Sequence, residues 1–177
     1  MRLPKGADTP SVADFSALGA LEGPVSAGVA LLSKGKVLEN LLNHLEDLKG
    51  TPFQAAAEAL AEKAPWVFGH INKVLPRSLG EGKHGLHWID SESGLSQIAV
   101  NPTQVNTGLF SAPADTLGHE ATHAAQALME GGPSTYLSRY AKELGERGYQ
   151  GSKYEVGARK AGVALRKRAQ VPPRKEP

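Results

Sequence analysis

The sequence predicts a mainly helical α+β fold, and three observations support this class. Apolar residues recur at helical intervals in several stretches, two short runs with strand character stand close together, and aromatic residues make up only 6% of the composition. At 177 residues the chain can bury one hydrophobic core, and without cysteine it must do so without disulfides. We expect an irregular lead or linker over residues 1–35, one compact domain over 36–170 and a flexible basic tail over 171–177.

The lead carries no expected membrane span. Residues 15–32 are rather apolar, but Glu22, Gly23 and Pro24 interrupt them. The acidic residues upstream do not resemble the cationic start of a secretory signal. We therefore expect a soluble chain for which export would need a route independent of a signal peptide, and a cytoplasmic location stays open.

Three helices are expected next. Val37–Leu48 has leucines at helical intervals, Pro52–Lys63 follows with a similar apolar face, and Trp66–Leu75 forms the third helix, ended by Pro76. A leucine stripe can be an interface for a partner, but in a chain of this length we expect it to be buried in the same domain.

A β-hairpin is expected after these helices. The runs Leu86–Asp90 and Leu95–Val100 are joined by the polar connection Ser91-Glu92-Ser93-Gly94, and Asn101-Pro102 ends the second run. A short polar connection between two such runs favours antiparallel pairing.

The most informative stretch is His119-Glu120-Ala121-Thr122-His123. Two histidines four residues apart on a helix project from one face and can bind one metal ion, and Glu120 beside them can accept a proton from a metal-bound water without binding the metal. Pro113 and Asp115 mark the start of this helix and Gly131-Gly132-Pro133 its end. The pattern predicts a zinc-dependent hydrolase; the alternative is a solvent-facing helix with two incidental histidines.

The segment HEATH within LGHEATHAAQAL resembles the metal helix of the zincin metallopeptidases, and the resemblance covers chiefly residues 84–166. It implies that His119 and His123 bind one Zn²⁺ per chain, that Glu120 is the general base, and that a third ligand comes from a later helix. Zincins also carry an antiparallel edge strand just before this helix, to which an extended peptide can add. We therefore expect Gln97–Val100 to form the rim of a cleft for a protein or peptide substrate.

The third ligand is expected to be a carboxylate, because the chain has no cysteine and no histidine after His123. The site then resembles that of the gluzincins. Glu130 would lie about 10 Å along the same helix and is expected to be solvated. Glu143 has a spacing similar to the thermolysin-like branch, although its neighbours are those of an ordinary charged face.

Glu155 is favoured over Glu143, because its E-x-x-A pattern resembles the third-ligand helix of several compact HExxH families. Small residues around it would let its helix approach the metal helix closely: Gly157, Ala158, Ala161 and Gly162. Glycine costs roughly 1 kcal/mol in a helix, so these glycines suggest a packing reason. The alternative, that both glutamates are solvated helix residues, stays open.

An oxyanion donor is also needed, and Tyr149 is the first candidate because it lies in the loop-like segment ERGYQGS. His84 or His87 comes second, although His87 fits equally well on the polar side of a strand. Tyr136 is a further candidate, and Tyr154 is expected in the core because it shares a helical face with small apolar residues. His44 and His70 sit in helical, amphipathic surroundings and are expected to have no role in the reaction.

Rival functions remain at this stage. Seven cations near the C-terminus would suit nucleic-acid phosphates or an anionic membrane, but the net charge is only +2 and no aromatic residues are interleaved. We therefore expect a solvated helix face rather than nucleic-acid binding. A non-catalytic zincin-fold binding module and a cell-wall amidase are further alternatives. The composition is similar to metallopeptidase toxin domains of bacterial secretion-system effectors, which implies a delivery or immunity protein as partner.

Overall fold

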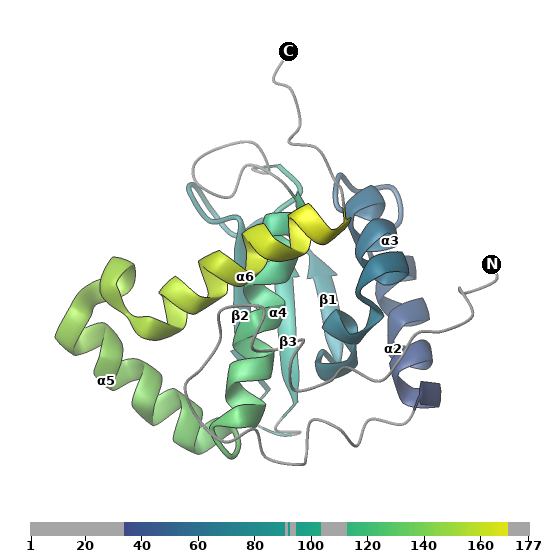
Figure 1. Cartoon of the computed structure of the whole chain (residues 1–177). Coiled ribbons are helices and arrows are strands. Elements are labelled where there is room, and N and C mark those ends of the chain that lie inside the picture. The colour runs from purple at the N-terminus through teal and green to yellow at the C-terminus, as the bar shows by residue number, and fades with distance from the viewer. Residues whose placement is uncertain (1–33, 91, 93–94, 104–112, 170–177) are drawn as a thin grey trace.

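The computed structural model describes residues 34–90, 92, 95–103 and 113–169, and its architecture is α+β and mainly helical, as the sequence predicts (Figure 1). The elements in chain order are α2 (Lys34–Asp47), α3 (Gln54–Lys63), the 3₁₀ helix η2 (Pro65–His70), β1 (Lys73–Pro76), β2 (Gly85–Ile89), β3 (Ser96–Val100), α4 (Pro113–Met129), α5 (Pro133–Gly151) and α6 (Lys153–Ala169). Nearly all of the expected lead, the tail 171–177 and most of the connection 91–94 lie outside the described residues. Among the described helices, none is both long and apolar enough to cross a membrane.

The sheet has three strands in the order β1-β3-β2. β2 and β3 are antiparallel, with His87 opposite Ile98, so the predicted hairpin is confirmed. β1 pairs with β3 in parallel, with Val74 opposite Ile98. This second pairing makes β3 the central strand, and the prediction that Gln97–Val100 is an edge strand at the rim of a cleft is wrong. The edge position beside β3 belongs to β2.

The predicted helix Trp66–Leu75 is also wrong, because its second half is β1. The 3₁₀ helix ends before Ile71, whose backbone is extended at φ −110° and ψ 124°. From there the chain bonds to β3, starting with the Asn72 amide, which donates to the Ser96 carbonyl at 2.8 Å. Val74 is fully buried in this strand. The pairing partner lies more than twenty residues further along the chain, so the local apolar period could not reveal the strand.

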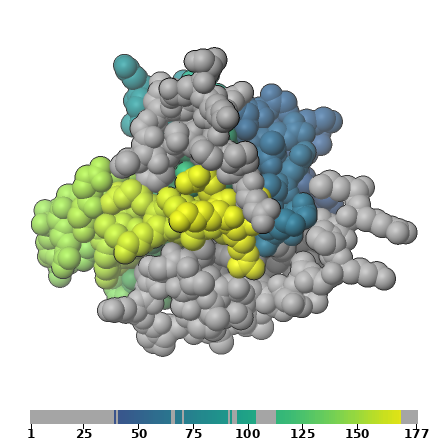
Figure 2. All heavy atoms as spheres, turned by 45° about the horizontal axis from the view of Figure 1, so that its top comes forward, coloured from purple at the N-terminus to yellow at the C-terminus, as the bar shows by residue number. Residues whose placement is uncertain are grey.

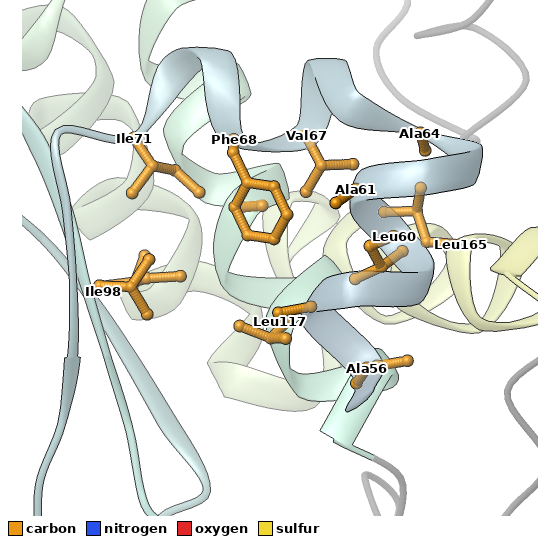
Figure 3. Packing of buried hydrophobic residues seen from close by; sticks show 14 of the residues in the cluster. Ala56, Leu60, Ala61, Ala64, Val67, Phe68, Ile71, Ile98, Leu117 and Leu165 are labelled. Carbon is orange, nitrogen blue, oxygen red and sulfur yellow. The ribbon is translucent and has the colours of Figure 1, made fainter. Parts of the chain in front are cut away.

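The main core lies between the sheet, α4 and the helices α2, α3 and η2 (Figure 3). Its larger side chains include Leu60 and Phe68, and α4 contributes Leu117. Leu41 and Leu48 of the predicted leucine stripe are buried, but Leu42 is 49% exposed, so the stripe is narrower than expected. Burial of these side chains supplies most of the non-directional stabilisation of the fold.

The helix α6 crosses α4 on the face opposite the sheet, between α5 and the α2 and α3 helices (Figures 1 and 2). Two glycines permit this close crossing. A Cβ atom on Gly162 would lie 2.5 Å from the carbonyl oxygen of Asp115, and one on Gly118 would lie 3.0 Å from the Cα of Gly162. The packing reason expected for the glycines of α6 is thus found at Gly162. The Asp115 carboxylate, almost fully buried, also accepts a 2.8 Å ion-paired hydrogen bond from Arg166 of α6.

Candidate metal centre

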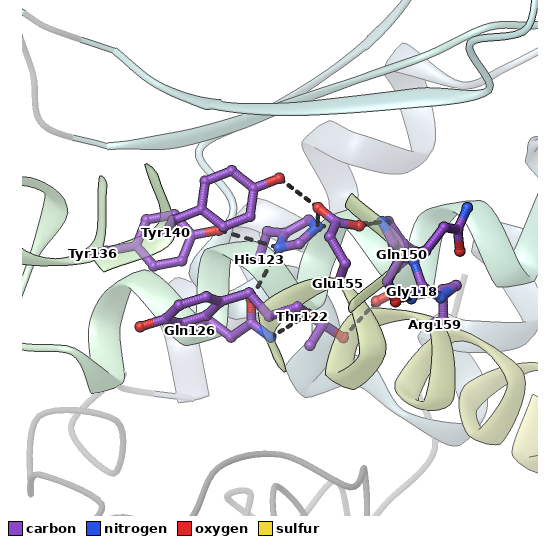
Figure 4. Close-up of polar contacts among 11 residues, drawn as sticks. Gly118, Thr122, His123, Gln126, Tyr136, Tyr140, Gln150, Glu155 and Arg159 are labelled. Atoms are coloured by element: carbon purple, nitrogen blue, oxygen red, sulfur yellow. Dashed lines mark hydrogen bonds and ion pairs between the residues drawn. The ribbon is translucent and has the colours of Figure 1, made fainter. Parts of the chain in front are cut away.

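Three buried donors from two helices meet at the crossing of α4 and α6, and Figure 4 shows two of them, His123 and Glu155. His119 and His123 lie one turn apart on α4, and their Nε2 atoms are 3.2 Å apart. Glu155 comes from the first turn of α6, with Oε2 3.3 Å from His119 Nε2 and Oε1 3.3 Å from His123 Nε2. The three residues are 4%, 5% and 1% exposed, so the donors are almost fully buried.

These distances fit a tetrahedral metal ion. With bonds of about 2.0–2.1 Å, as nitrogen and oxygen ligands make to zinc, neighbouring ligand atoms of a tetrahedron are about 3.3–3.4 Å apart. The two Nε2 atoms, 3.2 Å apart, have nearly this spacing, and each lies 3.3 Å from a different oxygen of the Glu155 carboxylate, which therefore faces both histidines. Glu155 Oε2 is buried and accepts no hydrogen bond among the described residues. The donor set therefore suits a small divalent cation, with one position left for water or substrate.

The other two glutamates considered from the sequence lie elsewhere. Glu143 accepts a hydrogen bond from the Lys153 amide at 3.2 Å and pairs with Arg147 at 3.6 Å, so it caps the start of α6. Glu130 pairs with Arg139 and accepts a 2.8 Å hydrogen bond from the Tyr154 hydroxyl. The expectation that Glu130 is solvated is wrong, because its side chain is only 11% exposed.

Glu120 lies beside the three donors, and one of its carboxylate oxygens is within 4.8 Å of both histidine nitrogens. Glu120 thus belongs to the same group of side chains that could hold a metal ion. Burial raises the pKa of Glu120, whereas His119, His123 and the backbone amide of His87 oppose the rise. Glu120 is thus a buried carboxylate with increased proton affinity, as a general base near neutral pH requires.

The strand β2 lies close to the Glu120 carboxylate. A Cβ atom on Gly85 would lie 2.6 Å from Glu120 Oε1 and 2.7 Å from its Cγ, so only glycine fits without displacing Glu120. Sequence reasoning missed Gly85. A glycine at the start of a predicted strand can signal a close approach, but nothing local identifies the group that approaches.

Glu155 and His123 each shift the pKa of the other. Burial alone would raise the pKa of Glu155, but the nearby His119 and His123 rings and the hydrogen bond from Tyr140 outweigh it and hold the pKa well below its usual range. Burial alone would lower the pKa of His123, but the Glu155 carboxylate and Glu120 raise it. The carboxylate of Glu155 therefore stays ionised in the folded protein, which is the form that binds a cation.

Two tyrosines of α5 contact the side chains of Glu155 and His123. The Tyr140 hydroxyl donates to Glu155 Oε1, and the Tyr136 hydroxyl lies 3.1 Å from His123 Nδ1. Their rings stack with centroids 5.6 Å apart, as neighbours four residues apart on one helix can. Sequence reasoning missed Tyr140. Tyr154 is fully buried, so its expected position in the core is confirmed.

Tyr149 lines a pocket that also contains His119, His123 and Glu155, and it is 49% exposed. It follows Gly148, whose φ of 65° breaks the regular path of α5. Burial of the hydroxyl raises the pKa of Tyr149, and the Glu155 carboxylate raises it further, so the hydroxyl stays protonated near neutral pH. The predicted oxyanion donor is therefore at the candidate site and can donate a hydrogen bond.

The pocket beside these side chains has a volume of about 620 Å³, and one of its walls is β2 with the residues just before it. His84 and His87 both line it. His87 stacks near His123 with centroids 6.0 Å apart, and its Nε2 lies 3.1 Å from Ser96 Oγ. Burial, and then the charge of His123, lowers the pKa of His87 to about 3, so this ring is neutral.

Two of the basic residues of the C-terminal region form contacts within the protein. Arg166 is paired with Asp115, and Arg159 donates to the Gln150 carbonyl at 2.7 Å with its guanidinium 5.7 Å from the centre of the Tyr149 ring. Arg174 and Lys175 lie outside the described residues.

His44, expected to have no role in a reaction, is buried in α2 and its Nε2 is 2.7 Å from the Ile71 carbonyl oxygen.

Comparison with known proteins identifies no relative: no family model, no curated protein and no solved structure matches this chain. The geometry of the pocket is thus the main guide to function.

Proposed function

We propose that this chain is a zinc-dependent metallopeptidase of the zincin type that hydrolyses peptide bonds, with one Zn²⁺ held by His119, His123 and Glu155. The observation that carries the proposal is a group of three buried donors with the Glu120 carboxylate beside them: the two histidine Nε2 atoms are 3.2 Å apart, and each lies 3.3 Å from one oxygen of Glu155. A bound zinc ion would supply a Lewis acid that polarises the substrate carbonyl and lowers the pKa of a coordinated water to about 7.

Glu120 moves the proton in this proposal. It accepts a proton from the attacking water and passes it to the leaving amine, so that the same group is general base and then general acid. Its burial and raised pKa favour the first transfer, because they increase its affinity for the proton. The backbone amide of His87 holds the carboxylate in place, and Gly85 leaves space for it.

Tyr149 is the proposed donor to the oxyanion that forms on the carbonyl oxygen. Its hydroxyl is protonated near neutral pH, and its ring is half exposed at the pocket wall, where a substrate can reach it. His87 is the second candidate, since a neutral imidazole carries one N–H. An oxyanion donor is worth roughly 10²–10³-fold in kcat.

The substrate is proposed to be an extended peptide segment that lies against β2. In the described sheet, β2 is hydrogen-bonded only to β3, and residues Gly85–Trp88 line the pocket. Backbone groups on the open side of such a strand can bind a peptide through main-chain hydrogen bonds. The role as an effector toxin, with a delivery or immunity protein as partner, rests on the resemblance of the sequence to such domains.

The first test is metal content combined with matched glutamate variants. We expect about one zinc per purified chain. Glu120→Gln should keep the zinc and lose peptidase activity by roughly 10²–10⁴-fold, because the base does not ligate. Glu155→Gln should weaken zinc binding by more than the roughly 10–100-fold typical of losing an outer-sphere partner. Glu143→Gln is the matched control on the neighbouring helix and should retain zinc.

The outcomes separate the alternatives. Zinc loss in Glu143→Gln without loss in Glu155→Gln would contradict the ligand assignment. Zinc binding with no cleavage of a denatured protein or a peptide library would favour the binding module, and cleavage of peptidoglycan alone would favour the cell-wall amidase. Salt-sensitive binding to DNA by a protein that holds no zinc would favour the nucleic-acid alternative.

A further inference from the structure

Gln126 is a buried polar residue that the proposed mechanism leaves unused. It lies on α4 one turn after His123 and is 0% exposed. Its amide contacts two groups on different helices, the His123 ring on α4 and the main chain of α6 (Figure 4). A fully buried amide is costly unless both of its ends are bonded, so its two contacts specify its orientation.

The contact with α6 fixes which end of the amide is which. The Gln126 Nε2 atom lies 3.0 Å from the carbonyl oxygen of Tyr154. A main-chain carbonyl can only accept a hydrogen bond, so the NH₂ end must face it. The amide oxygen, Oε1, then faces His123 Nδ1 at 2.9 Å.

This orientation favours one tautomer of His123. An amide oxygen only accepts, so its bond to the facing Nδ1 needs a hydrogen there, and the neutral ring then has its lone pair on Nε2. That lone pair is directed at the space between His119 and Glu155, whose nearest atoms are 3.2 and 3.3 Å away. The opposite tautomer has two partners of its own, because the Tyr136 hydroxyl, 3.1 Å from Nδ1, could donate to that nitrogen and a hydrogen on Nε2 would face Glu155 Oε1. Gln126 therefore shifts the balance between the two tautomers towards the one whose Nε2 is free to bind a metal ion.

The same amide also holds the helix that carries Glu155. Tyr154 immediately precedes Glu155, so the bond from Gln126 fixes the main chain next to that carboxylate. We propose that Gln126 is a positioning residue which sets the lone pair of His123 and the placement of Glu155 together. Its consequence for zinc binding rests on the proposed function, whereas its effect on the His123 tautomer does not.

The test measures the tautomer and the metal affinity separately. In metal-free protein at a pH where the histidines are neutral, nitrogen-15 NMR should find more of the form with hydrogen on Nδ1 of His123 in the wild type than in Gln126→Leu. Gln126→Leu should populate the form with hydrogen on Nε2 and weaken zinc binding, measured by competition with a chelator, by roughly 10–100-fold. Gln126→Glu keeps an acceptor at Nδ1, so it should retain the native tautomer and bind zinc more tightly than Gln126→Leu.

Thr122→Val is the matched control, because Thr122 is equally buried on α4 but bonds only to the Gly118 carbonyl of its own helix. It should leave both readouts unchanged. A tautomer population and a zinc affinity in Gln126→Leu that equal those of the wild type would overturn the inference. Equal losses in Thr122→Val would also overturn it. Failure of wild-type protein to bind zinc would sink the proposed function, and the tautomer would still decide the role of Gln126.

Discussion

The two sides of α4 differ in the kind of side chain that they bury. Towards α2, α3 and η2 it packs against large apolar side chains, including Leu60 and Phe68. Towards α5 and α6 it buries ionisable and polar groups whose partners are single atoms at defined distances: Asp115, His119, His123, Gln126 and Glu155. Apolar packing tolerates changes of shape that keep volume, whereas hydrogen bonds and metal ligands do not. We therefore expect stability to depend mainly on the first side and activity on the second.

The largest change in stability is expected from the apolar side. Phe68 is fully buried, and Phe68→Ala should lower the free energy of unfolding by about 3–5 kcal/mol, because it removes a large side chain and leaves a cavity. Urea unfolding measures this loss. The remaining folded protein should bind zinc as the wild type does, and a parallel loss of zinc affinity would break the comparison between the two sides.

A smaller loss is expected at the helix crossing, where Gly162→Ala places a methyl group against the Asp115 carbonyl. The two helices must separate, at a cost of about 1–3 kcal/mol in unfolding free energy, and Glu155 should move from the histidines so that zinc binds more weakly. Gly145→Ala on α5 is the matched control. Nothing lies within 4 Å of its added Cβ, so it should stabilise the protein by up to roughly 1 kcal/mol through helix propensity.

His44 is the polar exception on the apolar side and predicts a pH dependence. Burial lowers its pKa, and the Ile71 carbonyl opposes this. Below a pH of about 6.5 the unfolded chain binds a proton that the folded chain does not. The free energy of unfolding should therefore decrease as the pH is lowered, by at most about 1.4 kcal/mol per pH unit. The dependence ends at the lowered pKa of the folded state.

The variant His44→Gln isolates this contribution, because glutamine keeps an amide donor for the Ile71 carbonyl but does not titrate. Chemical unfolding between pH 7 and the folded-state pKa should give a steeper dependence for the wild type than for the variant. Parallel curves would mean that His44 takes up its proton in the folded state as readily as in the unfolded chain.

The smallest change in stability is expected at Gly85, where a substitution should affect the reaction instead. Gly85→Ala places a methyl group 2.6 Å from the Glu120 carboxylate, so the base must move. We expect zinc to be retained, unfolding free energy to change by less than about 1 kcal/mol because the strand is at the sheet edge, and kcat to fall by roughly 10²-fold or more. Unchanged kcat would show that Glu120 is not the group that needs this space.

Local periodicity predicted some elements well and failed at others for an identifiable reason. The helices α2, α3 and α4 and the β2–β3 hairpin follow from residues close together in sequence. β1 does not, because its stabilising bonds come from β3 and its own apolar residues also fit a helix. The same missing pairing led to the wrong edge strand, and so to the wrong wall of the pocket.

The sequence by itself determined the histidine pair and the neighbouring Glu120, since a helix of 3.6 residues per turn brings positions four apart to one face. It also limited the third donor to a few glutamates and pointed to the small residues of α6. Only the tertiary structure placed Glu155, and not Glu130 or Glu143, beside the histidines and revealed Tyr140, Gly85 and Gln126 around them. Contacts between helices and strands depend on how separate elements pack, and one chain's local pattern carries no record of which atoms that packing brings within 3 Å.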